Sequence, residues 1–152
     1  MNALFISECK NYKSLTDSTR KLNVPASGTN KRADRLGGSY PSFDWKGEGW
    51  YRVMGGAGTR IPENPFTSVQ SIGWKHCKNY CPGYLPSGSH PQTPGKLVDN
   101  VKVCYNCDYK YFNSKTMCNY NDFNAIKIRH CGDYFVYYLT GNGVYASRYC
   151  TE

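Results

Sequence analysis

The stretch AIKIRHCGDYFVYYL, residues 125–139, contains the two clearest strand signals of the chain. In residues 125–129 apolar and basic side chains alternate, which predicts a strand that buries its two isoleucines and leaves Lys127 and Arg129 in water. In residues 134–139 both faces are apolar, which is typical of a strand at the centre of a sheet. The stretch therefore predicts a β-sheet with residues 134–139 inside it.

Three further segments, rich in β-branched or aromatic residues and bounded by turn residues, are also strand candidates: Trp50–Met54, Leu97–Val103 and Ala146–Tyr149. Few segments have a helical period, although Ser14–Leu22 could form one or two helical turns. The sequence has no internal repeat. The expected fold class is mainly β: a small, irregular, disulfide-rich single domain with long loops that spans residues 1–152.

Segments rich in proline, glycine and serine separate the expected strands. The longest is VPASGTNKRADRLGGSYPS, residues 24–42, which has almost no apolar periodicity and is expected to be a long surface loop. Pro62–Pro65 and Leu85–Lys96 are two shorter loops, and the prolines and glycines of the second exclude a regular ladder of strand hydrogen bonds. Gly55–Arg60 is rich in glycine but lacks the lysine of a phosphate-binding loop, so it predicts a tight turn.

The cysteines predict the compartment. An even number at irregular spacing favours four disulfide bonds, which persist only where the environment is oxidising. Residues 1–6 are too few for a signal peptide and no apolar run could span a membrane, so we expect a secreted, extracellular domain whose leader is missing from this sequence. The eight predicted disulfide cysteines are Cys9, Cys77, Cys81, Cys104, Cys107, Cys118, Cys131 and Cys150.

Two cysteine pairs permit a different interpretation. Cys77 with Cys81, and Cys104 with Cys107, have a spacing that could complete a four-thiolate zinc site. The four remaining cysteines have no role in such a site, so structural disulfides are favoured, and neither a metal nor a cofactor is predicted. Cys104 and Cys107 also have the spacing of a redox-active pair, but the following Asp108 would oppose thiolate formation.

No motif predicts an enzyme or a nucleic-acid partner. No Gly-x-Ser-x-Gly turn is present, and His90, which precedes Pro91, is expected to support its loop rather than to act in catalysis. The 11 acidic residues show no spacing that marks an acid/base pair. The net charge of +8 comes from basic residues that occur singly or in pairs, which is typical of a soluble basic surface.

The region from residue 105 to residue 124 is the best candidate for a ligand-binding surface, because it interleaves aromatic residues with asparagine and aspartate. Carbohydrate sites combine an aromatic face, which packs against the sugar ring, with short polar side chains that reach its hydroxyl groups. The alternative is a solvated loop in which the tyrosines pack locally and the asparagines form turns. The candidate ligand-binding residues are Tyr105, Tyr109, Tyr111, Asn119, Tyr120, Asn121 and Asp122.

Motifs in a fixed order run through nearly the whole chain: Cys9-x-x-Tyr12-x-x-Leu15, Gly49-Trp50-Tyr51-Arg52, Arg60-Ile61-Pro62, Pro82-Gly83-Tyr84-Leu85, Ile126-Lys127-Ile128 and Arg148-Tyr149-Cys150-Thr151. In this order they resemble the eight-cysteine extracellular domain family of uromodulin and the pancreatic zymogen-granule membrane glycoprotein. The resemblance implies a secreted or cell-surface domain without catalytic activity. It also implies a role in adhesion, in mucus or matrix assembly, or in microbial recognition.

The cysteine pattern departs from that family. Phe43, Pro65 and Tyr145 stand where the family has cysteines, whereas Cys81 and Cys107 are additional. Disulfides tend to be lost and gained as pairs, because a single remaining thiol is reactive in an oxidising compartment. The resemblance therefore suggests a bond between Cys81 and Cys107, with the other six cysteines in three family-like bonds.

The chain has no Asn-x-Ser/Thr acceptor site for N-linked sugar, so it is expected to read glycans rather than to carry them. We predict a non-enzymatic recognition module, lectin-like in adhesion or microbial recognition, whose partner is a glycan or glycoprotein. The alternative is a structural component of matrix, mucus or venom that self-assembles into homo-oligomers through its tyrosine-rich surface.

Overall fold

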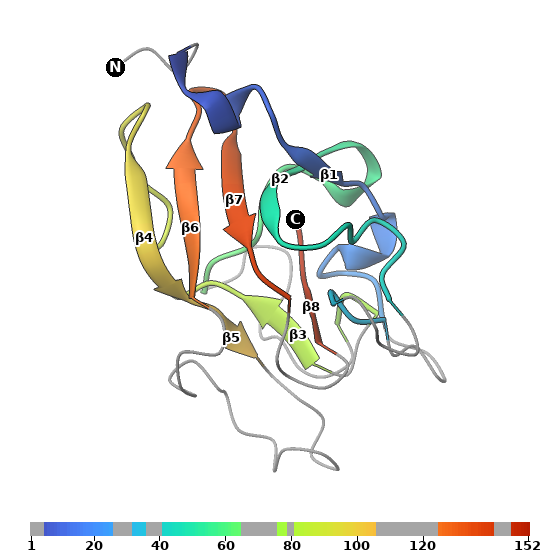
Figure 1. Cartoon of the computed structure of the whole chain (residues 1–152). Coiled ribbons are helices and arrows are strands. Elements are labelled where there is room, and N and C mark those ends of the chain that lie inside the picture. Colours follow the sequence, from blue (N-terminus) through green and yellow to red (C-terminus); the bar gives the residue numbers. More distant parts are fainter. Residues whose placement is uncertain are drawn as a thin grey trace.

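The computed structural model describes residues 5–25, 32–35, 41–64, 76–78, 81–105, 125–141 and 147–152. The described part is mainly β, as predicted, with a five-stranded sheet in the order β1-β2-β7-β6-β4 and a three-stranded sheet in the order β5-β3-β8 (Figure 1). The strands are β1 (Lys13–Leu15), β2 (Gly49–Val53), β3 (Cys81–Tyr84), β4 (Leu97–Lys102), β5 (Cys104–Tyr105), β6 (Ala125–His130), β7 (Phe135–Leu139) and β8 (Ser147–Tyr149). The helices are the 3-10 turns η2 (Ser7–Cys9), η3 (Ser18–Arg20) and η4 (Gly55–Ala57).

The five strands predicted from the sequence are confirmed as β2, β4, β6, β7 and β8, with ends that differ by at most one residue. Strand β7 lies between β2 and β6 and pairs antiparallel with both, which confirms its central position. The sequence did not predict β1, β3 and β5. Strand β3 contains Pro82 and Gly83, which are both disfavoured in strands, and the other two are very short.

The inner face of the five-stranded sheet forms the main core. Ile126 and Ile128 of β6 are fully buried there together with Tyr137 and Leu139 of β7, as the alternation predicted. Lys127 points to solvent, but Arg129 does not follow the prediction: its side chain is only 20% exposed and lies 2.8 Å from Glu8. Glu8 of the N-terminal segment compensates the charge of Arg129, so Arg129 can be half-buried.

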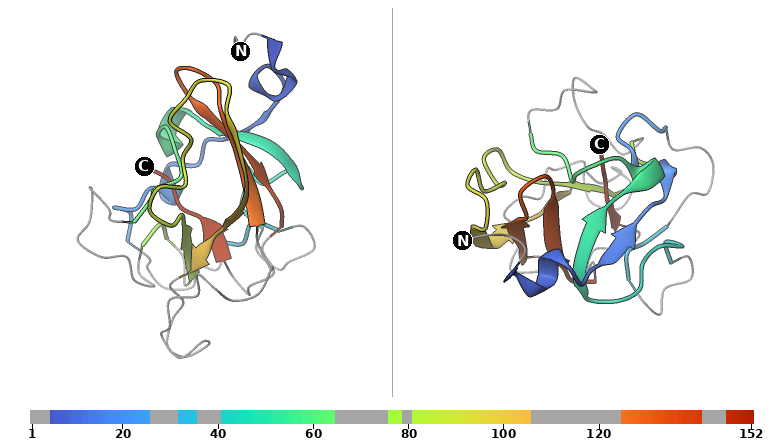
Figure 2. Two further views of the ribbon diagram at one scale, coloured as in Figure 1. Left: turned by 90° about the vertical axis from the view of Figure 1, so that its left-hand side faces the viewer. Right: turned by 90° about the horizontal axis from the view of Figure 1, so that it is seen from above.

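The N-terminal segment covers part of the outer face of this sheet. Ile6 and Cys9 pack against Val136 of β7, and a disulfide joins Cys9 to Cys131. Both views in Figure 2 place this segment and the C-terminal strand β8 on opposite sides of the sheet. The disulfide therefore fastens the start of the described chain to the turn between β6 and β7.

One turn of helix forms in the segment Ser14–Leu22, where one or two were predicted. It is the 3-10 helix η3, and the Asp17 side chain caps it by accepting a hydrogen bond from the backbone N–H of Thr19 at 2.9 Å. The turn brings Arg20 into the protein interior, where its side chain has no exposed surface.

The predicted surface loop, residues 24–42, includes a buried part. Ala33 is 5% exposed and Asp34 has no exposed surface. Asp34 can be buried because Arg20 compensates its charge. In a solvated loop the carboxylate would stay in water. Among the described residues of this segment, the regular structure consists of one isolated bridge between Ala33 and Pro41.

A second disulfide joins Cys77 to Cys150, and Cys104 is also disulfide-bonded, to a partner outside the described side chains. Because Cys77 and Cys104 have no free thiolate, the four-thiolate zinc interpretation is wrong. In the described ranges, no group of three or more His, Cys, Asp or Glu could hold a metal ion. None of the helices in those ranges is long and apolar enough to cross a membrane.

Candidate ligand-binding site

The ligand-binding residues predicted from the sequence fall into two groups. Tyr105 is 3% exposed and belongs to the main core, so its ring is not accessible to a ligand. The other candidates lie outside the described residues and remain predictions: Tyr109, Tyr111, Asn119, Tyr120, Asn121 and Asp122.

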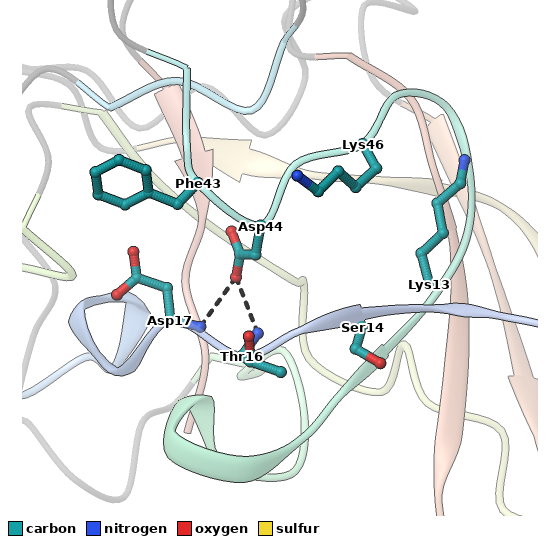
Figure 3. A pocket seen from close by; sticks show the side chains of 7 residues that line it. All are labelled: Lys13, Ser14, Thr16, Asp17, Phe43, Asp44 and Lys46. Atoms are coloured by element: carbon teal, nitrogen blue, oxygen red, sulfur yellow. Dashed lines mark hydrogen bonds between the residues drawn. The ribbon is translucent and has the colours of Figure 1, made fainter.

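A pocket of about 600 Å³ lies where β1 and the residues after it pass the segment 43–46 (Figure 3). Apolar, hydroxyl, cationic and carboxylate groups line it together. The lining residues are Lys13, Ser14, Thr16, Asp17, Phe43, Asp44 and Lys46.

Asp44 fixes the two segments relative to each other at the floor of the pocket. Its Oδ2 accepts hydrogen bonds from the backbone N–H groups of Thr16 at 2.9 Å and Asp17 at 3.0 Å, drawn as dashed lines in Figure 3. Burial would raise the pKa of Asp44, but the hydrogen bonds and positive charge of Arg20, with the backbone N–H groups, outweigh burial and lower the pKa to about 2. The carboxylate is therefore ionised and fully engaged below the pocket.

Arg20 is the centre of the buried network under this floor. Its guanidinium lies 2.6 Å from a carboxylate oxygen of Asp34 and 2.6 Å from one of Asp44, and it also donates to the carbonyl of Tyr149 at 2.9 Å. Burial opposes its charge, but the two carboxylates more than compensate and raise the pKa of Arg20. The two terminal nitrogens of Arg20 bind the two oxygens of Asp34. Bidentate contacts of this kind hold a guanidinium in one orientation, which makes the floor rigid.

A second buried guanidinium, that of Arg148, lies next to the first. It donates to the hydroxyl of Thr19 at 3.0 Å and approaches Asp17 at 3.3 Å. Burial and the nearby charge of Arg20 lower the pKa of Arg148 to about 10, so it stays protonated at neutral pH. Burial would raise the pKa of Asp17, but its bonds to Thr19 and the charge of Arg148 lower it. Both carboxylates of the pocket are thus paired with interior guanidiniums, and Arg20 is shared between Asp44 and Asp34.

The accessible wall of the pocket is aromatic and cationic. Phe43 is 69% exposed, and the guanidinium of Arg32 lies 4.0 Å from its ring centroid. The Lys13 ammonium donates to the carbonyl of Glu48 at 2.8 Å, whereas no hydrogen bond or ion pair to a described residue holds the Lys46 ammonium. The pocket therefore offers a ligand a phenyl ring, two ammonium groups and the hydroxyl groups of nearby residues.

This pocket was not predicted from the sequence, because its residues come from two segments that no spacing rule connects. One signal was available: Phe43 stands where the family that the chain resembles has a cysteine. A large apolar side chain in a polar loop is informative when it is exposed, but exposure cannot be predicted from one sequence.

His90 has the structural role that was expected. Its Nδ1 is hydrogen-bonded to the Glu63 carboxylate, and its Nε2 accepts from the Tyr137 hydroxyl at 2.7 Å. Tyr137 in turn accepts from the backbone N–H of Ile61 at 3.1 Å. Burial outweighs the attraction of Glu63 and lowers the pKa of His90, whose side chain is 2% exposed. A ligand cannot reach this chain of hydrogen bonds, so it supports the core and the residue 85–96 loop.

The chain is similar in sequence to a known domain family and to known proteins. The model of a family described as a uromodulin-like domain matches residues 51–151. The chain is 27% identical over 148 residues to the pancreatic secretory granule membrane major glycoprotein GP2 of Rattus norvegicus, and 28% identical over 148 residues to the protein of that name in Mus musculus. Each alignment covers 95% of this chain and 23% of the relative, so the chain spans about a quarter of the length of these relatives.

Proposed function

The chain belongs to the uromodulin-like domain family, and from that premise we propose that it is a secreted recognition module that binds glycans or glycoproteins. The family and the disulfides support an extracellular, disulfide-rich domain, and the lack of catalytic activity is part of the proposal. Glycan recognition, and its use in adhesion or microbial recognition, are the parts that we propose.

The pocket beside Phe43 is the observation that supports this proposal. An exposed aromatic ring can pack against the C–H face of a sugar, while hydroxyl and ammonium groups within reach can bind its hydroxyl groups. The floor that holds these groups is rigid, since buried ion pairs and two backbone hydrogen bonds fix it. A site that is already ordered loses little conformational entropy on binding.

A glycan-array screen tests the proposal. Disulfide-intact protein should bind a defined set of glycans, and a reduced and alkylated sample should bind none, because reduction removes the bonds that hold the fold. Phe43→Ser should lose the same signals. Phe5→Ser is the matched control, because Phe5 is 83% exposed and does not line the pocket.

A blank array with intact protein would contradict glycan binding. The structural alternative, self-assembly in matrix or mucus, then makes its own prediction: polymers that grow with protein concentration and that added sugar does not dissolve. Sedimentation at several concentrations separates this outcome from a glycoprotein partner, for which the free domain should stay monodisperse.

A further inference from the structure

We infer that the Phe43 pocket selects acidic sugars, that is, a pyranose that carries a carboxylate or a sulfate ester. The inference rests on the proposed function, since it names the ligand class of the same pocket. The inference comes from the net charge that a ligand meets in the pocket. This charge is more positive than the sum of the formal charges of the lining residues.

The lining residues include two carboxylates and two ammonium groups, so their formal net charge is zero. The carboxylates are not equivalent to the ammonium groups, however. The Asp44 side chain is only 7% exposed and is paired with Arg20, and the Asp17 side chain is 17% exposed and is paired with Arg148. Both guanidiniums lie in the interior with no exposed surface, and they oppose three carboxylates, because Arg20 is shared between Asp44 and the buried Asp34. One negative charge therefore remains in the interior, and the two ammonium groups of the pocket outweigh it.

The ammonium groups are on the accessible side and have no such compensation. In the described part of the chain, no carboxylate lies within ion-pairing distance of Lys13 or Lys46. Lys13 is partly engaged, because its ammonium donates to the Glu48 carbonyl at 2.8 Å and lies 5.6 Å from the ring centroid of Tyr51, so Lys46 is the freer of the two. Figure 3 shows the Lys46 side chain extending toward Asp44 and Phe43. The pocket thus presents an excess of positive charge beside an aromatic ring.

Each chemical part of an acidic sugar has a counterpart in the pocket. The anionic group fits the lysine ammonium groups, the C–H face of the ring fits Phe43, and the hydroxyl groups fit Thr16. The volume of about 600 Å³ is within the range of small-ligand sites, so one or two sugar units have enough room. A neutral sugar would use the ring and the hydroxyl groups but would leave the ammonium groups without a partner.

Three ligands with one common core test the inference: lactose, sialyllactose and sulfated lactose. Calorimetric titration of the disulfide-intact protein should give tighter binding for at least one acidic ligand than for lactose. That difference should shrink as salt is raised from low to physiological concentration, because exposed charges are screened within about 10 Å at ~0.1 M salt. The sialyl and sulfated arms show which anionic group the pocket prefers.

Lys46→Gln should weaken the acidic ligand by about fivefold, which is the size expected for one exposed charge pair, and should leave lactose unchanged. Lys127→Gln removes the same charge from β6, which is separated from β1 by β2 and β7, and should change neither ligand. The matched pair distinguishes the pocket from a general effect of net charge.

The outcomes distinguish selectivity for acidic sugars from glycan recognition itself. Equal, salt-independent binding of all three ligands would overturn the acidic selectivity and leave glycan recognition intact. Acidic ligands that bind Lys46→Gln and the unmodified protein equally would place the site elsewhere and overturn the inference. Failure of these ligands and of the whole glycan array would end both the inference and the proposed function.

Discussion

The guanidinium of Arg20 lies 2.6 Å from the carboxylate of Asp34, and neither side chain has any exposed surface. The same carboxylate accepts the backbone N–H of Tyr149 at 2.6 Å, and Arg20 donates to the carbonyl of Tyr149 at 2.9 Å. One ion pair therefore joins the N-terminal helix η3, the residue 33–34 segment and strand β8. These segments are far apart in sequence, so the pair closes the fold around the floor of the pocket.

Asp34→Asn should lower the free energy of unfolding by about 1–3 kcal/mol, because a neutral amide replaces the buried carboxylate that accepts from Arg20 and from the backbone N–H of Tyr149, while Asp44 remains as a counterion of Arg20. Asparagine keeps the shape of the side chain, so the loss reports charge rather than packing. Urea denaturation of the disulfide-intact protein, followed by tyrosine and tryptophan fluorescence, measures the change.

Arg60→Gln provides the comparison for this experiment. Arg60 pairs with Glu152 at 3.0 Å, but its side chain is 42% exposed. Water screens such a pair, and its loss should cost less than about 1 kcal/mol. Equal losses in the two variants would show that burial of the Arg20 network contributes nothing special to stability.

The sequence predicted strands well where side-chain alternation and burial agree. In β6 the isoleucines and Lys127 alternate because one face of the sheet meets the core, and in β7 both faces are apolar because Val136 packs under the N-terminal segment while Tyr137 enters the core. In β3 the prediction failed. Gly83 is there because its missing Cβ lets the Tyr105 ring and the Arg148 carbonyl approach closely, and tertiary packing of this kind leaves no periodic signal.

The network around Arg20 could not be predicted for a different reason. Charged residues in a segment rich in glycine and serine normally predict a solvated loop. Asp34 is buried because Arg20, from another segment, compensates its charge, and a single sequence does not show which charges pair. The pocket depends on Asp44, the second carboxylate that pairs with Arg20. Asp44 ties the segment 43–46 to the residues after β1.

Gly83→Ala should destabilise the domain by about 1–3 kcal/mol, the usual cost of overpacking a core. A Cβ at this position would lie 2.9 Å from the Tyr105 ring and 3.0 Å from the Arg148 carbonyl oxygen, and the latter is backbone in a paired strand. Gly141→Ala is the matched control, because its Cβ would meet its nearest neighbour at an ordinary 3.7 Å. Denaturation curves in which both variants match the unmodified protein would show that β3 moves to accommodate the methyl group.

The disulfide pairing gives a prediction that does not depend on stability. The bonds Cys9–Cys131 and Cys77–Cys150 use four of the six family-like cysteines, and Cys104 is bonded as well. We expect the remaining bonds to be Cys81–Cys107 and Cys104–Cys118.

Mass spectrometry of a non-reduced digest measures this pairing directly. Digestion at acidic pH keeps thiolate concentrations low and so prevents exchange between bonds. A peptide that links Cys81 to Cys104 would contradict the idea that the two additional cysteines were gained as a pair. Recovery of the two bonds seen in the structure is the internal control for the digest.

The buried His90 should make stability depend on pH below about 6.5. Burial lowers the pKa of His90 below its usual value of 6.5, so the unfolded chain takes up this proton at a higher pH than the folded protein does. Where the unfolded state binds more protons, the free energy of unfolding falls as pH falls; the contribution is therefore complete above pH ~6.5 and is lost below it. Protonation would also place an N–H opposite the Tyr137 hydroxyl, which already donates to Nε2.

His90→Gln should be less stable at neutral pH, because its bonds to Glu63 and Tyr137 are altered, but its stability should vary less as the pH falls below about 6.5. Denaturation at several pH values measures both slopes, and parallel curves for the two proteins would rule out His90 as the titrating group.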